Sequence, residues 1–403
     1  MTRNSDQGDR GATFRGYMEP SPDTPAQPGT HSAPPHGEGG ETPLVPLAQV
    51  ETPAALVDLD RARKNADRVV GYLSKHGLAW RPHVKTHKSL TLARIQLESG
   101  ASGLTVATLH EAEVMSALGA DLLLAHPPVG RGKEARLSRF LEEQTLSVAL
   151  DSRNSLDTVA RAGRSAGCTV PILVEIDVGM GRVGIVGPQE ALDLAREAEE
   201  SPHTSFRGVL FYPGHIRSPA SEQGHALAVV GDRLSRVLDV LKDAGLPPAV
   251  VSGGSTPTLW QSHRIPGVTE VRAGTCIFHD RDTLALGVCS EDQIAYRVLA
   301  SVVSTAVPGQ AVVDAGSKAL AKESFRSGGQ GFGRVWEHPE VVVRSVSEEH
   351  GILDLSETDW LPEVGDLISI LPNHVCVSVN LQDRLLEMTE HGVRPVALEA
   401  RGR

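Results

Sequence analysis

The stretch RPHVKTHKS, residues Arg81–Ser89, follows an apolar run that is typical of a β-strand and leads into a helical pattern. It places Lys85 at the end of the expected strand Leu78–Lys85, between two histidines and close to a second lysine. Neighbouring cations and imidazoles disfavour each other's charged forms, so a lysine in this setting can be more nucleophilic than one in water. Such an amine suits Schiff-base chemistry with an aldehyde cofactor, although the spacing alone fits a solvated basic turn equally well.

The composition of the chain limits the classes of function. With 403 residues the chain is long enough for two domains, and its low aromatic content with abundant Ala, Leu, Val and Gly is typical of an α/β protein. A formal net charge of −11 argues against nucleic-acid and anionic-membrane partners. No apolar run approaches the roughly 20 residues of a membrane span, and the first residues lack an apolar signal core, so we expect a cytoplasmic protein.

The pattern along the chain predicts three regions. Residues 1–46 are rich in Pro, Gly, Ser and Thr with few aliphatic clusters, which predicts a disordered tail. Repeated strand–helix units follow in residues 47–288, beginning with the strand Ala54–Asp60, and their number favours a closed (β/α)8 barrel. Short β-branched runs in residues 289–403, including His374–Asn380, predict an all-β domain. In such a barrel, ligand chemistry lies where strands end and loops begin.

A second glycine-rich stretch is a candidate phosphate cradle. The sequence SGGSTPT, residues 252–258, ends an expected strand and opens an expected helix with a proline near its first position. Its glycines allow backbone N–H groups to close on an anion, and its hydroxyls add donors. Many βα turns have this composition, but a position after the penultimate strand of a barrel favours a phosphate site. The candidate residues are Gly253, Gly254, Ser255 and Thr256, with Gly274 and Thr275 from the next turn.

The expected β domain contains a candidate metal site. The four cysteines are widely spaced and indicate no disulfide framework, and we assign three of them to packing. Cys376 is the exception, because residues two apart on a strand face the same side and His374 then points in the same direction. Imidazole and thiolate together favour Zn²⁺ over hard cations, although an isolated H-x-C pair is more often coincidental.

These motifs together resemble the D-threonine aldolase / D-serine dehydratase family of pyridoxal-phosphate enzymes, which have an alanine-racemase-like barrel. The resemblance is carried by the Arg81–Ser89 stretch, by residues 175–184, 272–275 and 347–351, and by 372–380 with its H-x-C. It implies that Lys85 holds the cofactor. Lys88 falls at the start of the expected helix, so we expect it to be a solvated surface group.

The resemblance also implies roles for other residues. Arg182 and Tyr212 would contact the cofactor, although Arg182 is also placed to pair with Asp177. His350 would be a nearby acid/base group. The pair His374 and Cys376 would bind a divalent metal. A homodimer, with a small D-amino acid as the substrate, is likewise implied by the family.

The reaction is less narrowly specified. The H-x-C form resembles the zinc-dependent D-serine dehydratases, whereas an aspartate in place of the cysteine is more typical of the aldolases. We therefore expect a lyase for D-β-hydroxy amino acids, a D-serine/D-threonine dehydratase that forms a 2-oxo acid and ammonia. A low-specificity D-threonine aldolase is the alternative, and an amino-acid racemase or a non-catalytic cofactor-binding protein remains open.

Overall fold

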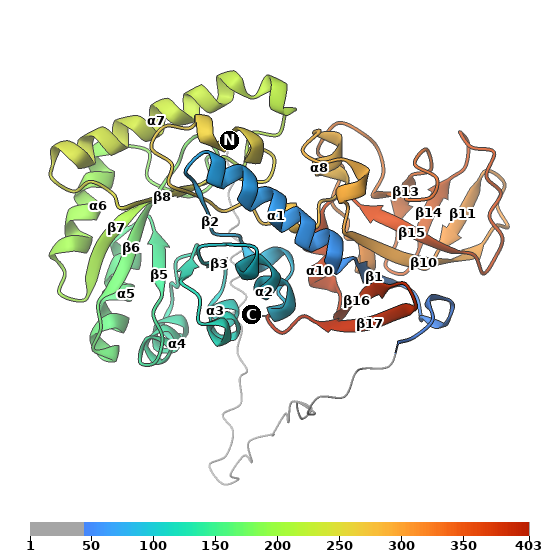
Figure 1. Cartoon of the computed structure of the whole chain (residues 1–403), viewed down its shortest axis with the longest axis horizontal. Coiled ribbons are helices and arrows are strands. Elements are labelled where there is room, and N and C mark those ends of the chain that lie inside the picture. The colour runs from blue at the N-terminus through green and yellow to red at the C-terminus, as the bar shows by residue number, and fades with distance from the viewer. Residues whose placement is uncertain (1–43, 403) are drawn as a thin grey trace, which may run out of the picture. The chain divides into compact units, whose positions relative to one another are not determined.

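The computed structural model describes residues 44–402, so the tail expected for residues 1–46 lies almost wholly outside the described residues. The first of its two sheets has eight strands in the order β2-β9-β8-β7-β6-β5-β4-β3, with every neighbouring pair parallel (Figure 1). The strands are β2 (Ala79–Trp80), β3 (Leu104–Val106), β4 (Leu122–Leu124), β5 (Ser147–Leu150), β6 (Val170–Ile176), β7 (Thr204–Phe211), β8 (Val250–Gly253) and β9 (Glu270–Val271).

This sheet is closed into a barrel by the stretch with which the sequence analysis began. Strands β2 and β3 stand at its two ends, and a parallel bridge between His83 and Thr105 joins them. The Thr105 N–H donates to the Pro82 carbonyl at 2.8 Å. The expected (β/α)8 architecture is confirmed, but β2 is far shorter than the strand Leu78–Lys85 that the sequence predicted.

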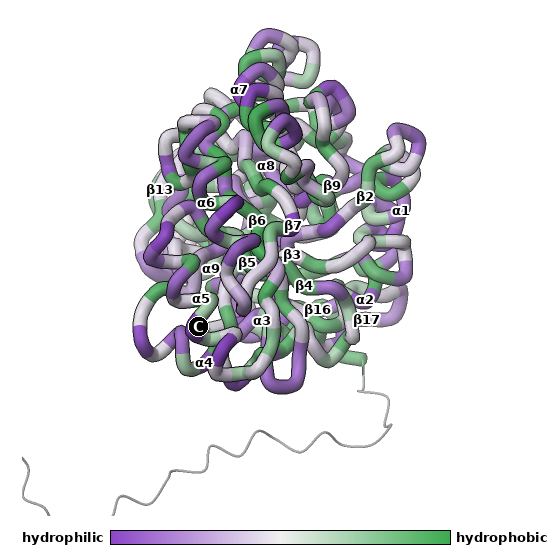
Figure 2. The backbone as a smooth tube through the Cα atoms, turned by 90° about the vertical axis from the view of Figure 1, so that its left-hand side faces the viewer, coloured by the Kyte–Doolittle hydropathy of each residue, from purple (hydrophilic) through white to green (hydrophobic). Residues whose placement is uncertain are grey.

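Helices surround the barrel because each has one apolar face. Apolar segments concentrate at the centre, where the strands run, and hydrophilic segments at the periphery (Figure 2). Within the barrel, Leu123, Ala149, Leu173 and Leu210 form a small cluster of their own. The helices are α1 (Leu59–Lys75), α2 (Leu90–Glu98), α3 (Leu109–Met115), α4 (Arg131–Leu141), α5 (Arg153–Ala166), α6 (Pro188–Glu200), α7 (Gly224–Asp243) and α8 (Arg281–Ala285).

The second sheet confirms a region made mostly of strands after the barrel. Its nine strands are β1 (Ala54–Val57), β10 (Tyr296–Ser304), β11 (Gln310–Val313), β12 (Gly333–Val335), β13 (Val343–Val346), β14 (Gly351–Asp354), β15 (Leu367–Pro372), β16 (Arg384–Thr389) and β17 (Gly392–Ala397). Two short helices accompany it, α9 (Ser317–Leu320) and α10 (Val375–Leu381). One core cluster contains residues of α1, β2 and β9 together with residues of this sheet, so the two sheets share a core.

Two local expectations are wrong. The strand at Ala54–Asp60 was expected to open the barrel, but β1 pairs with β10 and β16 of the second sheet. All four of its residues are buried, and such an apolar run satisfies either sheet, so tertiary pairing decides. The segment His374–Asn380 forms helix α10 rather than a strand. Its first N–H, from Val375, donates to the Asp280 carboxylate at 3.1 Å, a long-range contact that overrides the local β-propensity.

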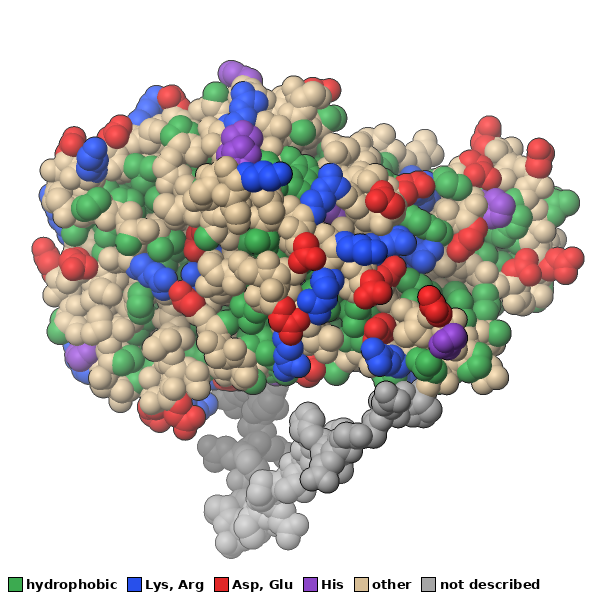
Figure 3. Space-filling view, in the orientation of Figure 1, with side chains coloured by type: hydrophobic (Ala, Val, Ile, Leu, Met, Phe, Trp, Pro, Cys, Tyr) green, Lys and Arg blue, Asp and Glu red, His purple; other side chains and the backbone are tan. Residues whose placement is uncertain are grey.

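On the face shown in Figure 3, acidic and basic side chains are interspersed rather than gathered by sign. None of the helices between residues 44 and 402 combines the length and apolar character needed to cross a bilayer.

A buried ion-pair network holds the barrel at the N-terminal ends of its strands. Arg81 Nε donates to both Glu270 carboxylate oxygens at 2.9 Å, and each side chain is only 6% exposed. The Arg81 guanidinium also donates to the Asp121 carbonyl at 2.9 Å and to its carboxylate at 3.1 Å. A Cβ at Gly103 would lie 2.3 Å from Arg81 Nη1, so glycine there leaves room for the guanidinium. Arg81 therefore connects the starts of β3, β4 and β9.

Two histidines are enclosed by the fold. Burial lowers the pKa of His87 to about 4, and burial likewise lowers that of His279 to about 4. The Ser89 N–H donates to His87 Nδ1 at 3.1 Å, so the His87 proton is on Nε2, which lies 3.1 Å from Gln96 Oε1. Both histidines are therefore held in the neutral form.

We predict that Glu270→Ala destabilises the protein by about 3–5 kcal/mol, because it leaves the buried Arg81 charge without its main partner. The measurement is urea unfolding followed by circular dichroism. Glu357→Ala, at an exposed position of the second sheet region, is the matched control and should leave the midpoint unchanged. Equal midpoints for both variants would contradict the role given to Arg81.

We predict that stability falls as the pH drops from about 6.5 to about 4. The folded-state pKa values of His87 and His279 lie below the unfolded value of 6.5, so in this window the unfolded chain binds more protons. Each histidine then removes about 1.4 kcal/mol per pH unit from the free energy of unfolding. Unfolding at a series of pH values should show a shallower slope for His87→Gln than for His391→Gln, which alters an exposed turn.

Candidate active site

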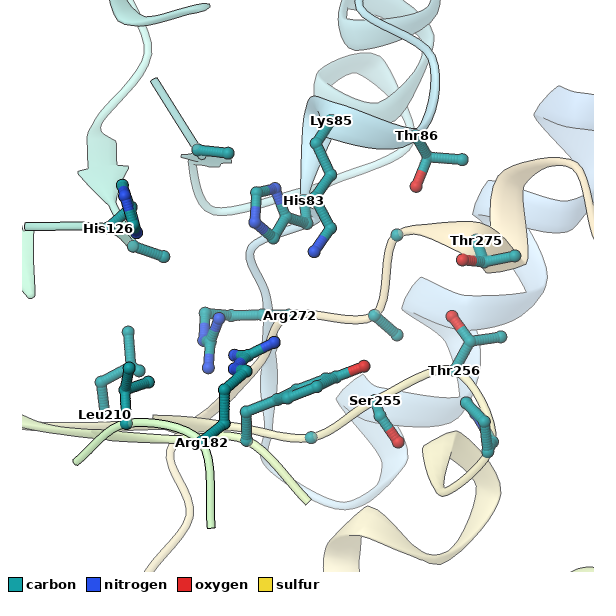
Figure 4. A pocket seen from close by; sticks show the side chains of 18 of the residues that line it. His83, Lys85, Thr86, His126, Arg182, Leu210, Ser255, Thr256, Arg272 and Thr275 are labelled. Atoms are coloured by element: carbon teal, nitrogen blue, oxygen red, sulfur yellow. The ribbon is translucent and has the colours of Figure 1, made fainter. Parts of the chain in front are cut away.

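A cavity of about 660 Å³ opens at the C-terminal ends of the barrel strands (Figure 4). Leu210, from the cluster inside the barrel, is among the residues that line it. Each of the eight strands contributes a residue that ends or follows it, as expected for a barrel whose loops carry the chemistry. These residues are His83, Ala107, Ala125, Asp151, Glu175, Tyr212, Gly254 and Arg272.

Lys85 lies in this cavity but not at a strand end. It is in a single 3-10 turn, Val84–Thr86, that follows the bridge at His83. In the Arg81–Ser89 stretch Lys85 is the one exposed residue, and its side chain extends beside His83 into the cavity (Figure 4). Burial, and then the charges of Lys85 and Arg272, lower the pKa of His83 well below its usual value.

Lys88 is not the solvated surface group that the sequence analysis expected. It is 9% exposed, and its Nζ lies 3.2 Å from Glu111 Oε1. Glu111 comes from α3, 23 residues further along the chain, so nothing in the local pattern indicates that Lys88 is buried. The two lysines of the stretch therefore differ in their surroundings: Lys85 faces the cavity, and Lys88 is buried beside Glu111.

The candidate cradle residues gather on one side of the cavity. Ser255, Thr256 and Thr275 line it together (Figure 4), with Gly254 directly before Ser255 and Gly274 directly before Thr275. Gly254 has φ +84°, a conformation that favours glycine. A Cβ at Gly274 would lie 2.4 Å from the His83 carbonyl, so glycine there allows the cradle turn to pack against the turn that carries Lys85.

Gly253 has a different role from the other cradle candidates. It ends β8 and does not line the cavity; a Cβ there would lie 2.1 Å from the Phe211 ring. The helix expected from Pro257 is instead a turn followed by the 3-10 segment Leu259–Arg264. Gly253 thus allows β8 to pack against the Phe211 ring, next to the cradle.

Arg182 and Tyr212 both line the cavity, as expected. The Arg182 guanidinium lies over the Tyr212 ring, 5.1 Å from its centroid. The Asp177 carboxylate instead accepts the backbone N–H groups of Gly179, Met180 and Gly181 and so organises the turn before Arg182. The geometry therefore favours the cavity-facing interpretation of Arg182 over a local ion pair.

Arg272 is a site residue that the sequence analysis quoted but did not single out. It is 6% exposed, and its Nη2 donates to the Phe211 carbonyl at 2.7 Å. Its Nε has no partner among the described residues, nor does Nδ1 of His83. Burial raises the pKa of the nearby Glu175 carboxyl, while the charges of Arg272 and Arg182 act in the opposite direction. The position of Arg272 directly after the last barrel strand was the available signal.

His374 and Cys376 lie together, although not on a strand. His374 has extended backbone and precedes α10, and Cys376 is in the first turn of that helix. The Cys376 sulfur lies 3.3 Å from Thr86 Oγ1 and 3.6 Å from Thr275 Oγ1, between the lysine turn and the cradle. Within residues 44–402 no group of three or more His, Cys, Asp or Glu side chains has the arrangement of a metal site, so at His374 and Cys376 the protein offers two ligands.

Asp280 orients this pair and was missed by the sequence analysis. Its Oδ2 lies 3.1 Å from His374 Nδ1 and also accepts the Val375 N–H. Burial alone lowers the pKa of His374, but the Cys376 thiolate and the Asp280 carboxylate raise it well above its usual value. Burial raises the pKa of Cys376, and the His374 imidazolium outweighs this and lowers it. Each group thus favours the charged form of the other, and Asp280, at Nδ1, leaves the other ring nitrogen of His374 free for a metal.

His350 is not brought to the cavity. It is exposed in the turn between β13 and β14, and its carbonyl accepts the Ser347 N–H at 2.9 Å. It is absent from the residues that line the 660 Å³ cavity. The family-like motif around it gives no role that the geometry of this chain supports.

Comparison with known proteins gives two family matches. The alanine racemase N-terminal domain matches residues 57–282, and the putative serine dehydratase domain matches residues 295–388. The D-threo-3-hydroxyaspartate dehydratase of Delftia sp. (strain HT23) is 34% identical over 353 residues, covering 82% of this chain and 92% of the relative.

Solved structures give the same result. The D-threonine aldolase of Filomicrobium marinum superposes with a TM-score of 0.81 at 29% identity, covering 90% of this chain and 99% of that one. A D-threo-3-hydroxyaspartate dehydratase variant with one cysteine replaced by alanine, in its metal-free form, superposes with a TM-score of 0.79 at 31% identity, covering 88% and 98% of the two chains. This chain therefore belongs to the D-threonine aldolase / D-serine dehydratase family, with an alanine racemase N-terminal domain joined to a serine dehydratase domain.

Proposed function

We propose that this chain is a pyridoxal-phosphate- and metal-dependent lyase for D-β-hydroxy amino acids. The reaction is the elimination of water from D-serine or D-threonine, with release of a 2-oxo acid and ammonia. One observation carries the proposal: the Cys376 sulfur lies 3.3 Å from Thr86, the neighbour of Lys85, and 3.6 Å from Thr275 of the cradle. A covalent cofactor site and a metal site would thus share one centre.

The residues present fit pyridoxal phosphate. Lys85 supplies the amine for its aldehyde, and the turns that contain Gly254, Ser255 and Thr275 supply backbone N–H groups and hydroxyls for its phosphate. Arg272, with its unpartnered Nε, brings a buried positive charge to the far side of the cavity. When bound, the cofactor supplies an electron sink that stabilises negative charge at the substrate Cα.

The residues also fit a thiophilic divalent metal. An imidazole and a thiolate, with Asp280 behind the imidazole, form the donor set expected for Zn²⁺ with open positions for substrate and water. His374 lines the cavity that holds Lys85, so a metal at this pair would act as a Lewis acid for the substrate hydroxyl. That one relative was solved in a metal-free form supports a metal in related enzymes.

The proton chemistry is assigned to Lys85. When its amine is free, Lys85 would be the base that takes the substrate α-proton, and the lysine ammonium so formed would give a proton to the β-hydroxyl, which would then leave as water. The product then takes up water and releases ammonia as the 2-oxo acid forms. In the aldolase alternative a base removes the hydroxyl proton instead, and the Cα–Cβ bond breaks to give glycine and an aldehyde. Cys376 in place of an aspartate favours elimination over cleavage.

Other functions fit the chain less well. A racemase would need a second base on the opposite face and no metal, whereas the His374–Cys376 pair adjoins the cavity. A cofactor-binding protein without catalysis would not need the serine dehydratase domain that matches residues 295–388. The proposal includes a homodimer that works in the cytoplasm on a small-molecule substrate.

We predict that purified protein with added pyridoxal phosphate and zinc converts D-serine or D-threonine to the 2-oxo acid and ammonia. Each of D-serine, D-threonine and D-3-hydroxyaspartate is tested, and the products are scored as oxo acid plus ammonia or as glycine plus aldehyde. Chelation should abolish the reaction and zinc should restore it. Glycine and aldehyde as the main products would replace the dehydratase assignment with the aldolase.

We predict that Asp280→Asn weakens metal binding by about 10- to 100-fold, because the amide no longer holds the His374 ring as a carboxylate does. Competition with a chromogenic chelator measures this affinity. Asp239→Asn, on the exposed face of α7, is the control. Cys376→Ala should lose more affinity than Asp280→Asn, and unchanged metal affinity in both variants would remove the metal from the proposal.

A further inference from the structure

The turn that carries Lys85 has backbone hydrogen bonds of its own, from the His87 and Lys88 N–H groups to the Val84 carbonyl, but its exit into α2 is strained and uncapped. Lys88 has φ +53°, a left-handed conformation that is unfavourable for a lysine. Ser89 is the N-cap of α2 but makes no capping hydrogen bond, and its Oγ has no partner among the described residues. The conformation at Lys88–Leu90 therefore depends on contacts from elsewhere in the chain.

The segment 398–402, which follows β17, supplies these contacts. It lies beside the barrel helices α2 and α3, where the label C stands in Figure 1. The Ala400 N–H donates to the Lys88 carbonyl at 3.0 Å, and the Leu90 N–H donates to Glu399 Oε2 at 3.0 Å. Glu399 thus takes the capping place that Ser89 leaves open, and its charge is favourable at a helix N-terminus.

The side chain of Lys88 is also held in place by contacts. Its ion pair with Glu111 anchors it to α3, and Glu111 Oε2 also accepts the Ala107 N–H at 2.6 Å. Leu398 and Arg401 line a second cavity, of about 730 Å³, together with Lys85 and Lys88. The segment therefore forms one wall of this second cavity, which Lys85 also lines, and it contacts the turn that carries Lys85.

We propose that Glu399 is a positioning residue that holds the Lys85 turn in the conformation that binds the cofactor. The inference rests on the proposed function, in which Lys85 holds pyridoxal phosphate. A lysine side chain has four rotatable bonds, so its Nζ is placed reproducibly only if its backbone is held. Release of the cap allows residues 84–90 to populate open conformations, and cofactor affinity falls by the fraction of molecules in the closed one.

The test compares the full-length chain with Glu399→Gln, Glu399→Ala and the control Glu390→Ala, which alters an exposed turn between β16 and β17. Amide hydrogen exchange of the peptide that spans residues 84–92 is measured without cofactor. Pyridoxal phosphate is then titrated and followed by the absorbance of the lysine-bound form, and borohydride reduction with peptide mapping identifies the labelled lysine.

We predict faster exchange of that peptide and about 5-fold weaker cofactor binding for Glu399→Ala, a smaller change for Glu399→Gln, and none for Glu390→Ala. Unchanged exchange would overturn the clamp. Faster exchange with unchanged cofactor affinity would overturn positioning and leave only a structural contact. If Glu399→Ala loses protection from amide exchange throughout the chain, the whole protein is destabilised. The test of the clamp then rests on the exchange and cofactor affinity of Glu399→Gln.

The borohydride experiment separates this inference from the proposed function. Labelling of Lys85 in the unaltered chain is required by both. No labelling at Lys85, even with faster exchange in the variants, would contradict the proposed function itself, and the positioning role would fall with it.

Discussion

The pairing of the buried Arg81 with the buried Glu270 and with the more exposed Asp121 is the constraint on which the rest of the site depends. It connects the first strand of the barrel to the last and to the strands beyond the closing bridge. Because β2 has only two paired residues, few backbone hydrogen bonds hold this strand in the barrel. The ion pairs of Arg81 supply further contacts that hold it there. Because Arg81 is held in place, His83 two residues later can form the β-bridge with Thr105. Lys85, two residues further, then lies in the cavity at the C-terminal ends of the strands.

The same nine residues serve both ends of the barrel. Arg81 is buried at the N-terminal ends of the strands, His83 closes the sheet, and Lys85 projects into the cavity. His87, Lys88 and Ser89 then turn inward, held by Gln96, Glu111 and the segment 398–402. The stretch is thus a structural edge with one exposed amine, which explains why a substitution at almost any of its positions would disturb the site.

The chemistry is divided between the two sheets. The barrel supplies Lys85, Arg272 and the glycine turns, which suit an anionic aldehyde cofactor. The region after it supplies His374 and Cys376, while Asp280, from the connection between the two sheets, orients the imidazole. Since one core cluster spans both sheets, these groups belong to one packed framework, as the proposed reaction on a single substrate requires.

Local sequence determined the parts of this protein that depend on short-range geometry. The alternation of strands and helices indicated the barrel, the glycines of residues 252–256 and 274 indicated a cradle, and Lys85 and the H-x-C pair were named from their motifs. What only the tertiary structure decided were the partners: the sheet that β1 joins, the helix at 375–381, the burial of Lys88, and the roles of Arg272, Asp280 and Glu399. Each depends on a contact between residues far apart in the chain, and the free energy of such a contact overrides a local propensity that is worth only a fraction as much.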